Sequence, residues 1–142
     1  MRRRVALAAL VVALAGCGTH DRALSPACTD DRSTIARALT RAPAPVRLGD
    51  GTRLSDCLAD ADTDAELQSF GAVATGLADD LADRRDAVRL GYLIGAARRG
   101  AAGTNGVGAE LQHRLEVAAR RLDRPGEAAA ISRGMRAGER SG

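Results

Sequence analysis

The sequence has few aromatic residues. Its 142 residues include no tryptophan, one phenylalanine (Phe70) and one tyrosine (Tyr92). Proteins that bind unpaired nucleobases stack them on several aromatic side chains. Two isolated aromatic residues supply no such platform, so we do not expect a stacking site for bases or for sugar rings.

A net positive charge is also missing once the first residues are set aside. The whole chain holds 21 arginines, no lysine and 18 acidic residues. Residues 1–16 contain three arginines and no acid, so residues 17–142 hold 18 basic and 18 acidic residues. Binding to a nucleic-acid backbone depends on many cationic contacts to phosphate. We therefore expect no nucleic-acid partner.

Local signatures of cofactor and metal binding are absent. The sequence has no P-loop, no dinucleotide fingerprint, no zinc-ligand spacing and no nucleophile elbow. One acidic stretch resembles the start of an EF-hand calcium loop: Asp60, Asp62, Asp64 and Glu66. However, Ala65 and Gly71 stand where that loop requires a glycine and a bidentate glutamate. Helix capping explains the neighbouring acids more simply. We therefore expect no cofactor and no metal.

The candidates for catalysis are equally sparse. Of the two histidines, His20 precedes the expected domain, and His113 lies on the polar side of a predicted helix. Glu116 is three positions after His113, close enough to pair with it on the helix surface. Ser55 or Ser69 could act as a nucleophile only if the fold brought it to His113. We expect no catalytic residue and no enzymatic activity.

The N-terminus has the layout of a secretory signal. Three arginines, Arg2–Arg4, precede an apolar run of 11 residues, Val5–Ala15. That run is too short to span a bilayer, which takes about 20 residues. A buried helix of a soluble domain would show a polar face, and this run has none. We therefore expect the chain to be exported.

The apolar run is followed directly by a cysteine. The sequence LAGC, Leu14–Cys17, resembles the lipobox of bacterial lipoproteins at all four positions. The resemblance implies cleavage of a signal peptide, residues 1–16, and attachment of a diacylglycerol to the Cys17 sulfur. It also implies acylation of the new N-terminus and a place in the cell envelope, on the outer or periplasmic side of a membrane. The alternative is a plain cleaved signal followed by a chance cysteine.

Two further cysteines, Cys28 and Cys57, remain for the folded part. An even pair in an exported protein favours a disulfide over two free thiols. The chain-entropy model gives a loop of this length about 3–4 kcal/mol of stabilisation. A metal site would need more ligands.

The rest of the pattern predicts an all-α fold, a small bundle of four or five helices with one disulfide. Apolar residues recur at spacings of three and four after the Thr63–Glu66 capping-box pattern. Ser55 is the expected cap of a short helix before this one. A Gly-Asp-Gly turn at 49–51 predicts a short hairpin over 46–54 or an ordered loop. The longer helices are expected at 30–42, 64–84, 86–101 and 107–122.

Glycines within the predicted helices indicate close packing. Gly91 and Gly95 form a small-xxx-small pair, which we interpret as a tight contact between helices. Gly71 and Gly76 each weaken their helix by about 1 kcal/mol, so a close neighbour is expected there too. Residues 126–142 form either a short helix or a frayed tail.

The expected organisation is a signal peptide at 1–16, a lipidated tether at 17–27, a helical domain at 28–125 and the C-terminal segment 126–142. The stretches GDGTRLSDCLADADTDAELQ and RLGYLIGAARRGA resemble uncharacterised envelope proteins of actinobacteria, a resemblance that implies no activity. We expect a structural or protein-interaction role at the envelope, with an unknown protein partner and a membrane link through Cys17. The alternative is a small-ligand-binding module with a groove between helices. An exposed apolar patch would favour the first role and a pocket of polar groups the second.

Overall fold

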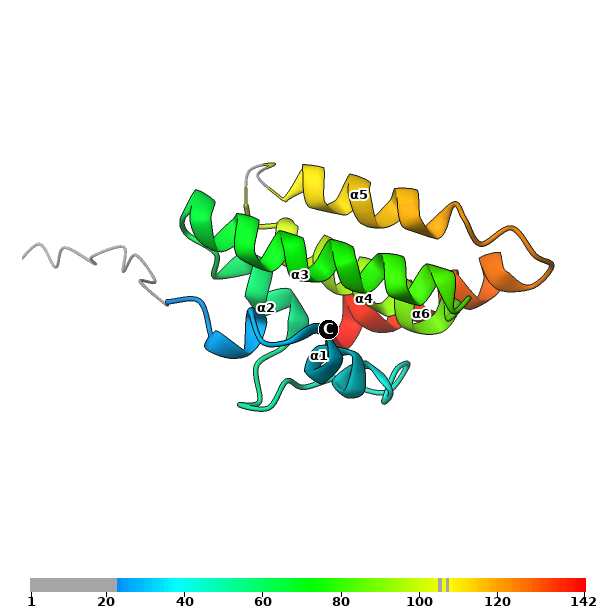
Figure 1. Cartoon of the computed structure of the whole chain (residues 1–142), viewed down its shortest axis with the longest axis horizontal. Helices are drawn as coiled ribbons and strands as arrows, with labels where there is room; N and C mark the ends of the chain where they lie inside the picture. Colours follow the sequence, from blue (N-terminus) through cyan, green and yellow to red (C-terminus); the bar gives the residue numbers. More distant parts are fainter. Residues whose placement is uncertain (1–22, 105, 107) are drawn as a thin grey trace, which may run out of the picture.

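The computed structural model describes residues 23–104, 106 and 108–142. This part of the chain is all-α and contains no strand, as predicted (Figure 1). It has six α-helices rather than four or five, because both a short helix after residue 53 and a long C-terminal helix form. The elements are η1 (Pro26–Cys28), α1 (Arg32–Leu39), α2 (Leu54–Ala59), α3 (Asp64–Asp83), α4 (Ala87–Ala101), α5 (Ala109–Ala119) and α6 (Glu127–Ser141).

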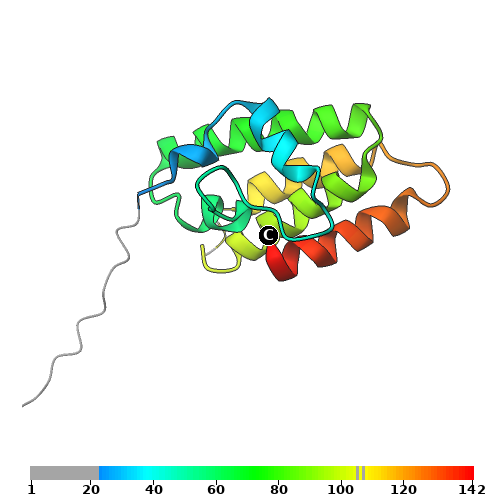
Figure 2. The ribbon, with the colours of Figure 1, turned by 90° about the horizontal axis from the view of Figure 1, so that it is seen from below.

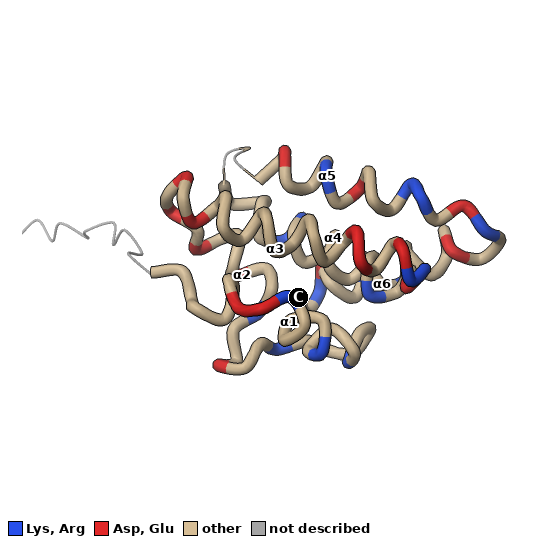
Figure 3. The backbone as a smooth tube through the Cα atoms, viewed as in Figure 1, with Lys and Arg blue, Asp and Glu red and all other residues tan. Residues whose placement is uncertain are grey.

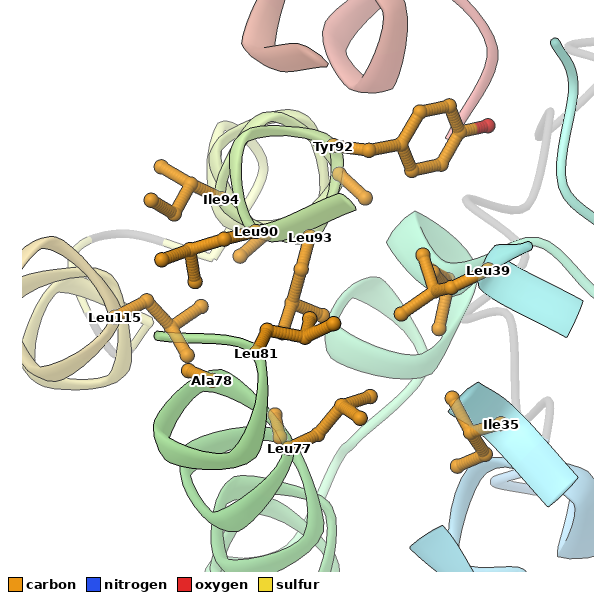
Figure 4. Close-up of a cluster of buried hydrophobic side chains, with 14 of the residues drawn as sticks. Ile35, Leu39, Leu77, Ala78, Leu81, Leu90, Tyr92, Leu93, Ile94 and Leu115 are labelled. Atoms are coloured by element: carbon orange, nitrogen blue, oxygen red, sulfur yellow. The ribbon is translucent and has the colours of Figure 1, made fainter. Parts of the chain in front are cut away.

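Helix α4 is the centre of the bundle. It contacts α2, α3, α5 and α6, and 11 of its 15 residues are buried. Leu90 and Ile94 point toward α5 and Leu115, while Leu93 points toward α3 (Figure 4). The apolar periodicity read from the sequence therefore faces a single leucine-rich core. No helix among the described residues is long and apolar enough to cross a membrane.

Glycines line the contact between α4 and α6. A Cβ atom on Gly134 would lie 2.1 Å from the carbonyl oxygen of Val88, and one on Gly95 would lie 2.1 Å from that of Met135. The two backbones therefore touch, and no larger side chain fits between them. Gly138 meets Tyr92 in the same way, one turn further along both helices, so α4 and α6 run in the same direction. The predicted close contact is confirmed.

The C-terminal segment is a fifteen-residue helix, not a frayed tail. Gly134 and Gly138 weaken a helix in isolation. Here they permit contact with α4, and that packing outweighs the weak propensity. The two glycines of α3 differ in their surroundings. Gly76 lies under the Arg32 side chain, whereas a Cβ atom added to Gly71 would have no atom within 4 Å. The expectation of a close neighbour is wrong for Gly71.

The capping residues are partly as predicted. The Thr63 hydroxyl accepts a hydrogen bond from the Glu66 amide (3.2 Å), and the Glu66 carboxylate accepts one from the Thr63 amide (3.1 Å), which confirms the capping box. Helix α1 is shorter than the predicted 30–42 and is capped by Asp31. Ser55 does not cap α2. It is buried, and its hydroxyl donates to the carbonyl oxygen of Gly142.

Residues 46–53 form an ordered loop and no hairpin. The Gly51 backbone has a φ of +88°, which glycine adopts readily, and the Leu48 amide donates across the turn to the Thr52 carbonyl (2.9 Å). The Val46 amide instead donates to the Tyr92 hydroxyl (2.9 Å). Tyr92 is fully buried, so its hydroxyl is not at the rim of the domain but holds this loop against α4.

The predicted disulfide is present. Cys28, at the end of η1, is bonded to Cys57 of α2, with the two Cα atoms 5.4 Å apart, and both residues are fully buried. Leu24 packs against the core and the Ser25 hydroxyl donates to the Asp50 carboxylate. The last residues of the expected tether therefore belong to the folded domain.

Candidate functional site

The expected anchor, Cys17, lies outside the described residues, as do the signal peptide and His20. His113 is exposed on α5, and its imidazole makes no hydrogen bond within the described part of the chain. Glu116 does not pair with it. Its carboxylate accepts from the Arg98 guanidinium (2.7 Å), because α4 and α5 pack together and Arg98 reaches across from α4.

The two candidate nucleophiles are both engaged elsewhere. The Ser55 hydroxyl is held by Gly142, as described above, and the Ser69 hydroxyl donates to the Ala65 carbonyl (2.8 Å) within its own helix. The structure thus does not join either serine to His113. No group of three potential metal ligands is found among residues 23–104, 106 and 108–142.

A groove lies between α1 and the C-terminal half of α3. Its cavity has a volume of about 460 Å³. Ala36, Leu77 and Leu81 supply apolar wall, and charged side chains stand around them. We call this the α1–α3 groove. Its charged residues are Asp31, Arg32, Arg37, Asp80, Arg84, Asp86 and Arg89.

Two aspartates of the groove face arginine partners. Arg89 binds the Asp86 carboxylate at 2.7 Å, and Arg32 lies 3.7 Å from the Asp80 carboxylate. The third acid, Asp31, caps α1. Hydrogen bonds from the hydroxyl and the amide of Ser33 hold the pKa of the Asp31 carboxyl below its usual range. All three acids therefore already have partners within the domain.

Two arginines remain without a carboxylate partner among the described residues, Arg37 and Arg84. Arg37 donates only to the Thr34 hydroxyl (3.1 Å), and no hydrogen bond or ion pair holds the Arg84 guanidinium. A guanidinium group presents several donors in a fork that matches carboxylate or phosphate oxygens. The groove is therefore suited to an anionic group attached to a small apolar body.

Sequence reasoning missed this groove because α1 and α3 are distant in the chain and meet only through packing. One local signal was available: α1 carries two arginines and no acid. Gly76 contributes by leaving room for the Arg32 side chain over α3. In the part of the chain that is described, Val117 is the one exposed large hydrophobic residue (45 % exposed).

Comparison with known proteins does not extend this picture, since no family model, no curated protein and no solved structure matches the chain.

Proposed function

We propose that this chain is a lipid-anchored protein of the cell envelope with a structural or protein-interaction role. The observation that carries the proposal is the Cys28–Cys57 disulfide. Disulfides persist in oxidising compartments outside the cytosol, which agrees with export. The basic, apolar leader and the lipobox-like LAGC supply the route and the anchor.

The surface indicates how a partner would be recognised. A stable apolar interface needs a contiguous exposed patch. Among the described residues Val117 is the one large apolar side chain that is exposed. The described surface therefore does not favour an apolar protein interface, and a protein partner would have to be recognised through charged and polar groups.

A second candidate function is binding of a small anionic ligand in the α1–α3 groove. Arg37 and Arg84, which line one cavity without carboxylate partners, favour it. Carboxylate and phosphate are the groups that such a pair would hold. Catalysis has no comparable support, so we retain a binding role.

The anchor is tested in the native host. Cys17→Ala should leave the precursor uncleaved at Gly16, abolish incorporation of labelled fatty acid and alter the membrane association of the protein. Thr19→Ala, two residues further on, is the control and should mature normally. If Cys17→Ala matures and pellets with membranes as the unchanged protein does, the lipoprotein proposal is wrong.

The groove is tested with the purified mature chain, residues 17–142. Inorganic phosphate and acetate should shift the amide resonances of α1 and of the α3 C-terminus, and Arg37→Gln with Arg84→Gln should abolish those shifts. Arg124→Gln, an exposed arginine outside the groove, should not. Pull-down from envelope extracts with the same variants separates the two roles: loss of a captured protein in the groove variant would place the protein interaction there.

A further inference from the structure

Charge is segregated along the chain although the total from residue 17 onward is neutral. Residues 32–53 contain five arginines and a single acid, Asp50, and residues 128–142 contain three arginines and a single acid, Glu139. Residues 54–83 contain no basic residue and eight acids, which are Asp56, Asp60, Asp62, Asp64, Glu66, Asp79, Asp80 and Asp83.

Folding brings the two arginine-rich segments together. The Tyr92 hydroxyl accepts from the Val46 amide at 2.9 Å and lies 3.4 Å from the Ser141 hydroxyl. The loop after α1 therefore runs beside the C-terminal part of α6 (Figure 2). We call the exposed arginines of the loop after α1 and of α6 the basic face: Arg41, Arg47, Arg133, Arg136 and Arg140.

The arginines of the basic face are unpaired among the described residues. None of its five guanidinium groups takes part in an ion pair within the described residues. On α6 the arginines follow at spacings of three and four, so they share one side of the helix, away from the glycines that meet α4. Arg99 adds positive charge at the same end, where it donates to the carbonyls of Glu139 (3.2 Å) and Arg140 (2.6 Å).

Five of the eight acids of residues 54–83 lie on α2, at the α2–α3 connection and at the start of α3. The other three, Asp79, Asp80 and Asp83, lie at the far end of α3, where Asp80 faces Arg32 of α1. Figure 3 shows acidic residues at the connection between α2 and α3 and again at the C-terminal end of α3, and basic residues on α1, the following loop, α5 and α6. The expected tether enters the domain near the acidic α2–α3 connection, because the Leu24 backbone is among the groups that lower the pKa of the Glu66 carboxyl. Five residues lie between Cys17 and Ala23, so the two are at most about 20 Å apart. An anchored domain could therefore reach the bilayer surface with its side as well as its end.

We propose that the basic face lies against the anionic phospholipid headgroups of the membrane that holds the anchor. The domain then rests on its side, within the reach of the tether. This placement rests on the proposed lipid anchor at Cys17. Each arginine close to an anionic leaflet strengthens binding about five-fold, and the attraction extends over about 10 Å at 0.1 M salt.

The test uses the mature chain, residues 17–142, with Cys17→Ser so that no lipid contributes. It should sediment with vesicles of phosphatidylglycerol and phosphatidylcholine, and not with phosphatidylcholine alone. Raising NaCl from about 0.05 M to about 0.5 M should release it. Arg136→Gln with Arg140→Gln should weaken binding by about tenfold or more. The matched control, Arg114→Gln with Arg124→Gln, changes the net charge equally outside the basic face and should have a much smaller effect.

Three results would overturn the proposal: absence of binding to the anionic vesicles, equal binding to neutral vesicles, or equal losses in the two double variants. The last would assign the binding to overall charge and not to a face. Circular dichroism of both variants checks that each remains folded. Because the chain tested carries no lipid, these results do not depend on whether Cys17 is lipidated in cells, and the Cys17→Ala experiment decides that separately.

Discussion

Helix α4 is packed in two different ways on its two sides. Toward α3 and α5 it presents leucine and isoleucine side chains, which fill the space between the helices. Toward α6 it presents Gly91 and Gly95, and the backbones meet directly. The first side is stabilised by burial of apolar area, about 25 cal/mol per Å². The second depends on close approach of main-chain atoms, so it has no room for added volume, whereas a leucine core tolerates exchanges that preserve volume.

The largest effect is expected from filling the α4–α6 contact. A Cβ atom on Gly138 would lie 2.2 Å from the Tyr92 carbonyl oxygen. Gly138→Leu should therefore destabilise the domain by about 3 kcal/mol or more, since the backbones must separate. Urea unfolding measures the loss. Ala129→Leu, at an exposed position of α6, is the control and should be nearly neutral; equal stability of the two variants would contradict direct backbone packing.

Truncating a leucine that packs against α4 on its other side should lower the stability of the domain slightly less. Leu115 is fully buried against α4, so Leu115→Ala removes apolar contacts and leaves a cavity, with an expected loss of about 2–4 kcal/mol. Leu115→Met preserves volume and should lose less than about 1.5 kcal/mol. If both variants unfold at the same urea concentration as the unchanged protein, this side does not carry the stability assigned to it.

Loss of the hydrogen bond between the 46–53 loop and α4 should have the third-largest effect on stability. Tyr92→Phe removes the acceptor of the Val46 amide and leaves that buried donor unpaired, which costs about 1–3 kcal/mol. Amide hydrogen exchange at Val46 should accelerate, while exchange in α3 and α5 should follow only the change in global stability. Unchanged exchange at Val46 would show that the hydrogen bond does not hold the loop.

Acid should weaken the ion pair between Arg85 and Glu127 at the start of α6. The Arg85 guanidinium binds Glu127 through two hydrogen bonds (2.8 and 2.7 Å) and thereby lowers the pKa of the Glu127 carboxyl. Its contribution is fully present above the unfolded pKa of about 4.3 and is lost as the pH falls through the lower folded value. The stability difference between the unchanged protein and Glu127→Gln should therefore shrink on titration from pH 7 to pH 3. A difference that stays constant would rule out this linkage.

The smallest effect has the opposite sign. Gly71 is in the middle of α3 and nothing lies within 4 Å of the position of a Cβ atom. Gly71→Ala should stabilise the domain by about 0.5–1 kcal/mol, because alanine favours the helix. Gly134→Ala, the same exchange in the α4–α6 contact, should destabilise it. The two thermal unfolding midpoints should move in opposite directions.

These contrasts show which features the sequence could predict. The main helices and the Thr63–Glu66 capping box were predictable because they depend on residues three or four positions apart. The roles of Gly71 and Gly134 were not, since a Cβ atom would meet open space at the first and the backbone of a neighbouring helix at the second. Ser55 illustrates the same limit: its hydroxyl binds Gly142, 87 positions away, and a local capping rule cannot anticipate that partner.

The α1–α3 groove was beyond local reasoning for a related reason. Arg37 and Arg84 come together only through tertiary packing, and their availability depends on which acids the neighbouring arginines occupy. The disulfide was predictable because the count of cysteines left a single pairing once Cys17 was assigned to the anchor. The basic face was hidden by the neutral total, which says nothing about where the charges lie after folding.

The order of helices along the chain has a consequence for biosynthesis. All the partners of α4 except α5 and α6 precede it, and α6 follows every helix of the leucine core. While the chain is being made, the core can assemble with Gly91 and Gly95 still facing water. The α4–α6 contact is then completed last. Helix α6 must dock in a single register, because the two backbones can touch only where the glycines of both helices lie. Arrival of α6 would act as the closing step of assembly, after which the loop, Tyr92 and the end of α6 are secured together.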